Sequence, residues 1–182
     1  MDYVIPAPEQ VSVAVVGETA RYPVRRIFCV GRNYVAHIRE MGGDERDPPF
    51  YFCKPTDAIV PTGGTIDYPP QTGNFHYEME LVAAIGKGGA NISEEDALDH
   101  VYGYATGLDM TRRDVQIAHR EKGRPWDMGK GFDQSAPCGD IHPVADVGHF
   151  PKGNLWLKVN GETKQDSDLE LMIWNLQETI AN

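Results

Sequence analysis

The chain has 182 residues, 41% of them hydrophobic, so one domain with a substantial core is expected, and neither a disordered nor a fibrous protein is. Its 27 acidic residues outnumber 17 basic ones, and the net charge of -10 argues against a nucleic-acid backbone or an anionic membrane as the main partner. No apolar run approaches the ~18 residues of a membrane span, and the N-terminus lacks the pattern of a secretory signal. The three cysteines are widely separated, which favours reduced thiols in a cytoplasmic protein over a disulfide framework or a zinc site.

The first half of the chain is predicted to be rich in strands. Residues 11–27 contain many β-branched side chains and are interrupted by glycine, which favours short strands. Glycines then bracket a short helix predicted at residues 34–41. A region rich in proline and glycine follows, with a strand predicted within residues 48–55. The segment FHYEMELVAAIG, residues 75–86, is predicted to be one buried strand.

Two helices and a strand are predicted next. The first helix is expected to begin at Ser93, whose side chain can act as the N-cap. The segment YGYATGLDM is predicted to be a buried strand that ends at Asp109. The second helix is predicted to have Thr111 as its N-cap, Asp114 in its first turn and Gly123 just past its end.

The last part of the chain begins with a predicted irregular loop at residues 124–144. Residues 154–166 form a predicted hairpin, because the dipeptide Asn160-Gly161 is typical of a type I′ turn. Residues 169–182 have apolar residues at helical spacing but neither a C-terminal glycine nor a basic last turn, which predicts a helix whose continuation is missing. Many short strands and few, short helices predict a β-rich α+β fold rather than a doubly wound one.

Two carboxylates, Glu78 and Glu80, lie two residues apart in FHYEMELVAAIG, so a continuous strand places both on one face. Like charges this close resist burial, and a divalent cation such as Mg²⁺, Mn²⁺ or Ca²⁺ accounts for their pairing. Asp109, at the end of the next predicted strand, can supply a third ligand. The alternative is a solvated face of an edge strand, although Val82 and Ala84 continue that face and make it apolar.

Three further groups have spacings that suit catalysis or substrate binding. His37 and Glu40 share a face of the first predicted helix, so the carboxylate can orient the imidazole as a base that activates water; a surface pair is the alternative. Lys130, between two glycines, can balance an acidic site or simply be solvated. Arg113 and Gln116 share a helix face and can hold a substrate carboxylate, or can lie on an exposed surface.

Taken in order, six segments resemble the fumarylacetoacetate hydrolase family: GRNYVAHIREMG, KPTDAIV, HYEMELVAAIGK, GYATGLDMTRRDVQ, GRPWDMGKGFDQSAPCG and LWLKVNGETKQ. Within the family, the fourth and fifth segments are most similar to the small acylpyruvases, such as those that act on fumarylpyruvate in gentisate degradation. The resemblance implies a catalytic domain over residues 27–182 with a mixed β-roll fold, preceded by short strands over residues 1–26. It also implies a homodimer that acts on a small keto acid, while the cysteines favour a cytoplasmic location and the net charge argues against a nucleic-acid or membrane partner.

By motif match, the resemblance also implies a Mg²⁺ or Mn²⁺ ion, with Ca²⁺ as a further option, and assigns roles to named residues. These are the metal ligands Glu78, Glu80 and Asp109, the water-activating dyad His37 and Glu40, the oxyanion-stabilising Lys130, and the substrate contacts Arg113 and Gln116. The implied reaction is hydrolysis of the C–C bond of an acylpyruvate to pyruvate and a carboxylic acid. The same site could instead decarboxylate oxaloacetate or isomerise a hydroxymuconate-type acid, or the chain could be an inactive metal-binding fragment.

The sequence departs from the family pattern at its end. Family members continue past a segment like MIWNLQETI with further strands that close the roll, and this sequence stops at Asn182. We therefore expect the fold to lack its last strands. We also expect the isolated chain to be poorly soluble and to turn over acylpyruvates weakly, because unpaired strand edges and uncovered apolar surface favour association.

Overall fold

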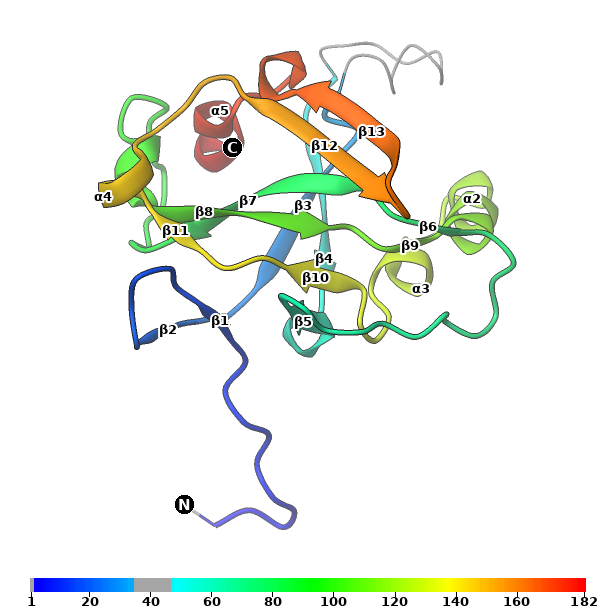
Figure 1. The fold of residues 1–182 in the computed structure, drawn as a ribbon. Coiled ribbons are helices and arrows are strands. Elements are labelled where there is room, and N and C mark those ends of the chain that lie inside the picture. Colours follow the sequence, from blue (N-terminus) through cyan, green and yellow to red (C-terminus); the bar gives the residue numbers. More distant parts are fainter. Residues whose placement is uncertain (1, 35–46) are drawn as a thin grey trace.

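The computed structural model describes residues 2–34 and 47–182, and its framework consists of short strands with a few short helices (Figure 1). The helix predicted at residues 34–41 therefore lies almost wholly outside the described residues. His37 and Glu40, the predicted water-activating dyad, lie outside them as well.

The longest strand among the described residues belongs to a central sheet of mixed direction. β8 (Val101–Leu108) pairs antiparallel with β7 (Met79–Ile85) along one edge. Along its other edge β8 pairs antiparallel with β10 (Ala136–Cys138) and β11 (His142–Pro143), and β10 pairs parallel with β5 (Ile59–Pro61). The combination of parallel and antiparallel pairing confirms the predicted mixed, β-rich architecture.

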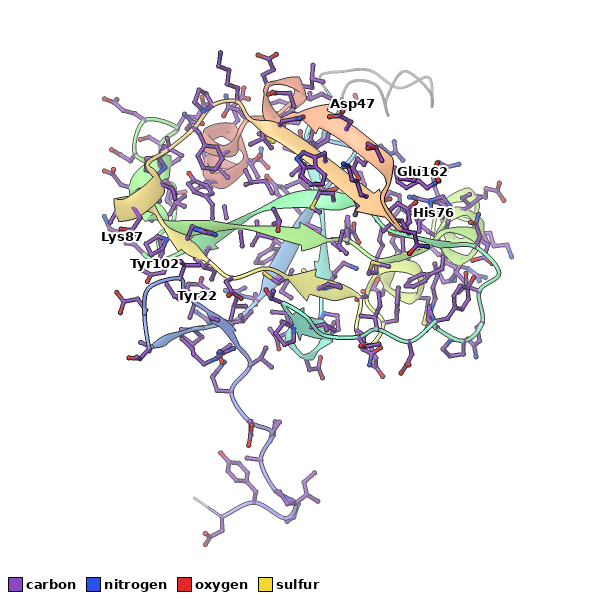
Figure 2. The ribbon with its side chains drawn as sticks, viewed as in Figure 1. Tyr22, Asp47, His76, Lys87, Tyr102 and Glu162 are labelled. Carbon is purple, nitrogen blue, oxygen red and sulfur yellow. The ribbon has the colours of Figure 1, made fainter. Side chains whose placement is uncertain are left out.

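Four two-stranded antiparallel sheets complete the set of strands. They are β1 (Ser12–Ala14) with β2 (Arg21–Pro23), β3 (Ile27–Gly31) with β4 (Phe50–Lys54), β6 (Phe75–His76) with β9 (Thr111–Arg112), and β12 (Asn154–Val159) with β13 (Glu162–Asp168). The β1–β2 sheet is joined to the central sheet by Tyr22, which stacks on Tyr102 with ring centroids 6.0 Å apart and donates a hydrogen bond to the carbonyl of Ile85 (Figure 2).

The helices are short, and none in the described part of the chain is long and apolar enough to cross a membrane. The α-helices are α2 (Arg113–Glu121), α3 (Asp127–Lys130), α4 (Val144–Val147) and α5 (Leu176–Ala181), and the 3-10 helices are η1 (Thr56–Ala58), η2 (Ala97–His100) and η3 (Leu169–Leu171). α2 and α3 lie together at the end of the central sheet that also carries β6 and β9 (Figure 1).

The hydrophobic core lies where β1 and the segment after β2 meet the central sheet. Its buried members are Val13, Val15, Val24, Ala84, Ala105 and Ile141. The half-buried side chain of Val82 packs against this cluster. Because Val82 and Ala84 alternate with residues on the opposite face of β7, the face that also carries Glu80 leads into the core, and a solvated edge-strand face is excluded for it.

The strand predicted over residues 75–86 is broken in the structure. β6 ends at His76 and β7 begins at Met79, so Glu78 precedes β7 and does not lie within a continuous strand. The break arises because the chain changes partner: β6 pairs with β9, whereas β7 pairs with β8. At the break, the Asp109 N–H donates a hydrogen bond of 2.8 Å to the Glu78 carbonyl. This bond links the segment between β6 and β7 to the segment between β8 and β9.

The predicted start of the helix after Asp109 was wrong, and its predicted end is confirmed. Thr111 lies in β9, where its hydroxyl donates to the carbonyl of Asp109 at 3.0 Å, so it caps no helix. α2 begins at Arg113, whose N–H is bonded to the carbonyl of Asn74. Gly123 lies past the end of α2 with a φ of +62°, the left-handed conformation that ends many helices.

The helix predicted to begin at Ser93 is shorter than expected. Ser93 does bond to Asp96 through side chain and backbone, but only the 3-10 turn η2 follows. The predicted loop over residues 124–144 contains α3, β10, β11 and the start of α4. These elements have two to four residues each, too few to show a periodic pattern.

The C-terminal segment does not form one continuous helix. η3 and α5 are separate because Asn175 starts α5 with a capping box formed with Glu178. Between them, Asn33 forms two hydrogen bonds of 2.9 Å with the backbone of Trp174, so the segment returns to the end of β3.

The hairpin predicted over residues 154–166 is confirmed as β12 and β13. Asn160 and Gly161 have φ angles of +52° and +84°, as a type I′ turn requires. β12 and β13 are joined by these two residues.

Replacing Gly161 with alanine should lower the free energy of unfolding by about 1 kcal/mol, because a side chain at positive φ is strained. A Cβ at this position would meet no atom within 4 Å, so strain is the only expected cost. Thermal denaturation should show a melting temperature lower by about 2–4 °C. The matched control is Gly88→Ala, at a glycine outside the positive-φ region whose Cβ would also meet nothing. Equal melting temperatures for the two variants would contradict the assignment of strain.

Candidate metal and substrate site

Three predicted metal ligands lie at neighbouring ends of β7 and β8. Glu80 lies in β7 opposite Gly107 of β8. Glu78 directly precedes β7, and Asp109 directly follows β8. The hydrogen bond from the Asp109 N–H to the Glu78 carbonyl ties these two residues together. The antiparallel pairing of β7 and β8 therefore brings Asp109 beside Glu78 and Glu80, which precede it by about 30 residues in the sequence.

Lys130 lies between two of these carboxylates. Its Nζ is 2.7 Å from Glu78 Oε2 and 2.6 Å from Asp109 Oδ2, and the residue is only 2% exposed. The burial excludes the alternative of a solvated loop lysine. α3 places it there: this helix ends at Lys130 and packs against β4 and β9.

A second buried lysine, which the sequence analysis missed, reaches the same cluster. Lys54, the last residue of β4, has its Nζ 2.9 Å from Asp109 Oδ1. It also donates hydrogen bonds to the carbonyls of Met110 and Lys130. The available signal was a lysine at the end of the otherwise apolar segment FYFCK. A lysine there is buried with the strand and requires partners.

Arg113 and Gln116, the predicted substrate contacts, come together on the first turn of α2. The Arg113 guanidinium donates to Gln116 Oε1 and forms an ion pair with Glu78. Gln116 is buried, so this face of α2 is turned toward the acidic cluster and not toward solvent. Their contact with substrate stays a prediction.

The surrounding charges move the pKa values of the two glutamates in opposite directions. Burial alone raises the pKa of Glu78, but Lys130 and Arg113 outweigh it and lower that pKa to about 2. For Glu80, burial and then the charges of Glu78 and Asp109 raise the pKa to about 8. Glu80 is therefore the carboxylate whose negative charge is least compensated.

The donor set fits a hard divalent cation. Asp109 Oδ1 is buried, and its ion-pair partner is the Lys54 ammonium 2.9 Å away. The carboxylate of Glu80 has no hydrogen bond or ion pair with any residue that the structure describes. All three side chains offer oxygen, which Mg²⁺ and Mn²⁺ prefer.

The three carboxylates do not form a closed metal site by themselves. Among residues 2–34 and 47–182, no group of three acidic, histidine or cysteine side chains converges closely enough to hold an ion. The ammonium of Lys130 lies within hydrogen-bond distance of both Glu78 and Asp109. A divalent ion and this ammonium therefore compete for the same oxygens.

A cavity of about 420 Å³ lies outside this cluster. Its lining includes Arg112, Phe132 and Tyr68, but none of the predicted site residues. Arg112 and Phe132 are sequence neighbours of Arg113 and Lys130, and the Arg112 guanidinium lies over the Phe132 ring. The chemistry of the acidic cluster, and not the volume of this cavity, marks the candidate site.

Comparison with known proteins gives consistent matches over nearly the whole chain. Residues 26–182 match the family described as fumarylacetoacetate (FAA) hydrolase C-terminal. The chain is 51% identical over 133 residues to a fumarylpyruvate hydrolase of Ralstonia sp, which covers 73% of this chain and 69% of the relative. It is 41% identical over 157 residues to the mitochondrial oxaloacetate tautomerase of Homo sapiens, covering 86% of this chain and 71% of that protein.

The fold also matches solved structures. The crystal structure of a fumarylpyruvate hydrolase from Pseudomonas aeruginosa in complex with Mn²⁺ and pyruvate is 54% identical, with a TM-score of 0.94. The match covers 99% of this chain and 79% of that one. The strand-rich fold expected from the sequence is thereby confirmed.

The raised pKa of Glu80 predicts a pH dependence of stability in the presence of a metal chelator. Between its ordinary value of 4.5 and about 8, the folded state holds a proton that the unfolded chain has released. The folded state binds more protons in this window, so the free energy of unfolding should fall as pH rises from about 5 to 8. The pKa of Glu78 is lowered, so this residue changes the free energy of unfolding only below about pH 4.5 and does not contribute to its pH dependence between 5 and 8.

Chemical denaturation at several pH values would measure this effect as the difference between the parent protein and Glu80→Gln. In Glu80→Gln, the free energy of unfolding should fall less between pH 5 and 8 than in the parent protein. In the control Glu162→Gln, at an exposed position of the hairpin, it should fall as in the parent protein. The same pH dependence in the parent and Glu80→Gln would contradict the assigned environment of Glu80.

Proposed function

The chain belongs to the fumarylacetoacetate hydrolase family, and from that premise we propose that it hydrolyses the C–C bond of an acylpyruvate such as fumarylpyruvate. One water is consumed, and the products are pyruvate and a carboxylic acid, which is fumarate for fumarylpyruvate. The observation that carries the proposal is the gathering of Glu78, Glu80 and Asp109 against the buried Lys130. The similar protein from Pseudomonas aeruginosa, solved with Mn²⁺ and pyruvate, supports it.

In this proposal Glu78, Glu80 and Asp109 hold a divalent ion, Mn²⁺ or Mg²⁺, with Ca²⁺ as a further option. When bound, such an ion supplies Lewis-acid stabilisation of the negative charge that develops on the pyruvate fragment. The Glu80 carboxylate supports this assignment, because no described residue donates a hydrogen bond to it, and burial together with the neighbouring carboxylates raises its pKa to about 8.

Water activation, oxyanion stabilisation and substrate binding are assigned to side chains of the protein. His37, oriented by Glu40, takes a proton from the water that attacks the distal keto carbon. Lys130 donates hydrogen bonds to the oxyanion that forms there. Arg113 and Gln116 hold a substrate carboxylate through the planar guanidinium and the amide. When the C–C bond breaks, the proton taken up by His37 is available for the new methyl group of pyruvate.

The buried cations also suit an anionic substrate. Lys54, Lys130 and Arg113 form ion pairs with Glu78 and Asp109, and a divalent ion held by the three carboxylates would give the site a net positive charge. An acylpyruvate with a second carboxylate, such as fumarylpyruvate, brings two negative charges. Electrostatic attraction in a low-dielectric site therefore favours a dianionic keto acid over a neutral one.

A second candidate activity acts on oxaloacetate by tautomerisation or decarboxylation. It is supported by the similarity to the human oxaloacetate tautomerase. Oxaloacetate also places a carboxylate and a keto group next to each other, and both reactions pass through an enolate. Isomerisation of a hydroxymuconate-type acid is a further use of the same site.

We further propose that residues 27–182 form the catalytic domain and that residues 1–26 lead into it. A homodimer in the cytoplasm that serves gentisate breakdown is consistent with the resemblance to acylpyruvases. The net charge of -10 supports a small-molecule substrate over a nucleic-acid or membrane partner.

A substrate panel tests the proposal. Fumarylpyruvate, other acylpyruvates and oxaloacetate would be incubated with the protein and Mn²⁺ or Mg²⁺, and the products identified. We expect pyruvate and fumarate from fumarylpyruvate at a rate well above that with oxaloacetate. A higher rate with oxaloacetate would instead favour the second candidate, and no turnover of any member of the panel would overturn both.

Replacing Glu80 with glutamine should weaken Mn²⁺ binding by on the order of 100-fold or more, because loss of a charged ligand should cost at least as much as loss of an outer-shell partner. Calorimetric titration with Mn²⁺ measures this, and turnover of fumarylpyruvate should fall in parallel. Glu162→Gln is the control and should bind Mn²⁺ as the parent does. Unchanged Mn²⁺ affinity in Glu80→Gln would remove Glu80 from the ligand set.

Replacing His37 with alanine should lower kcat by about 100-fold, as expected for loss of a general base, while Mn²⁺ affinity persists. Steady-state kinetics with fumarylpyruvate would measure kcat, and titration would measure the affinity. The control is His142→Ala, at an exposed position of β11. If kcat for His37→Ala stays within a few-fold of the parent value, another group activates the water.

A further inference from the structure

A glutamine of the β12–β13 hairpin contacts the backbone between the two paired glutamates. Gln165 Oε1 accepts a hydrogen bond from the Met79 N–H at 2.8 Å, and Gln165 Nε2 donates one to the Met79 carbonyl at 2.9 Å. The Met79 N–H belongs to the peptide that joins it to Glu78, and its carbonyl belongs to the peptide that joins it to Glu80. One side chain therefore fixes both peptide planes between the two carboxylates.

The backbone of Met79 requires such a partner. Met79 lies opposite Leu108 of β8, and the neighbouring carbonyl of Glu78 already accepts from Asp109 on that side. Along an antiparallel strand, successive residues direct their polar groups to alternate edges, so those of Met79 point away from β8. In the described part of the chain, no other strand pairs with β7, and the amide of Gln165 supplies the donor and acceptor that a strand would provide.

A β-bulge directs Gln165 to this position. Leu157 pairs with Gln165, but the next residue of β12, Lys158, pairs with Thr163, so Lys164 has no opposite residue. A bulge bends the strand and re-aims the side chains beside it. Gln165 is half-buried, whereas Thr163 and Lys164 are exposed. β12 contacts β7, and the hairpin lies alongside that strand (Figure 1).

The side chain of Glu80 depends on this backbone for its position. Its carboxylate has no hydrogen bond or ion pair with a described residue, so its place is set by the course of the chain through Met79. Glu78, in contrast, is also held by Lys130 and Arg113. The separation of the two carboxylates is then governed by the backbone dihedral angles of Met79, which the two hydrogen bonds of Gln165 restrict.

We propose that Gln165 is a positioning residue for a divalent ion, since it holds Glu80 at the distance from Glu78 that the ion requires. The inference rests on the proposed function, in which these glutamates are metal ligands. Groups that orient metal ligands affect metal affinity by about 10–100-fold when they are removed. Gln165 bonds to the backbone of Met79 and to none of the three carboxylates, so it acts through Met79.

The test uses Gln165→Met, which keeps an unbranched side chain of similar length but removes both hydrogen bonds. The matched control is Gln10→Met, because Gln10 Nε2 donates to the backbone carbonyls of Val11 and Val24 far from the acidic cluster. The dissociation constant for Mn²⁺ alone would be measured by the electron paramagnetic resonance signal of the free ion. We expect it to rise by about 10-fold or more for Gln165→Met and to stay within about two-fold for the control.

Amide hydrogen exchange supplies a readout that needs no turnover. In the chelator-treated protein, the Met79 N–H should exchange faster in Gln165→Met than in the parent, whereas the Val24 N–H, bonded to the Val11 carbonyl, should be unchanged. In the parent protein, Mg²⁺ should slow amide exchange at Met79 and not at Val24. The reason is that hydrogen bonds of Gln165 that favour metal binding are in turn stabilised by the bound metal. This last measurement decides the question even if Gln165→Met fails to fold.

Equal Mn²⁺ affinity of the parent and Gln165→Met overturns the inference, as does a Met79 exchange rate that Mg²⁺ leaves unchanged. Failure of the proposed function has a different signature. A parent protein that binds Mn²⁺ more tightly than Gln165→Met but hydrolyses no acylpyruvate would leave the positioning role standing and overturn the activity. A parent protein that binds no Mn²⁺ overturns both.

Discussion

The ion pair between Lys130 and Asp109 is the interaction on which the arrangement of the candidate site depends. Both residues are buried, and a buried charge without a partner costs several kcal/mol. The pair draws α3 and the end of β8 together, and the contact of Lys130 with Glu78 adds the start of β7. Lys54 adds the end of β4. The elements that form the site are therefore joined by charge pairing as well as by the strand ladder.

The site could be predicted from the sequence wherever a local pattern carried the information. Glu78 and Glu80 belong to one short segment, and Asp109 ends the next predicted strand; the structure brings the three together because these consecutive strands pair, as sequential strands usually do. Arg113 and Gln116 were expected to share a helix face, and they do. The Asn160-Gly161 turn was confirmed for the same reason, since two residues suffice to specify it.

Other features depend on contacts between distant segments and could not be predicted in this way. The break between β6 and β7 follows from a change of partner strand, which the residues on either side of Tyr77 do not reveal. Thr111 was expected to cap a helix, but it lies in β9 because β9 pairs with β6. Lys54 was missed because a lysine after an apolar strand has no periodic signature, and its role appears only when Asp109 is beside it.

The balance of charge in the cluster has a consequence for the order of assembly. Lys54, Lys130 and Arg113 form ion pairs with Glu78 and Asp109, and Glu80, whose pKa is raised to about 8, can hold a proton, so none of the three carboxylates requires a metal ion in order to be buried. Folding is then not coupled to metal supply, in contrast to small zinc domains that are unfolded when empty. The polypeptide can therefore reach its native structure first. Metal binding then replaces contacts of the Lys130 ammonium with contacts of a divalent ion, at a site that is already folded.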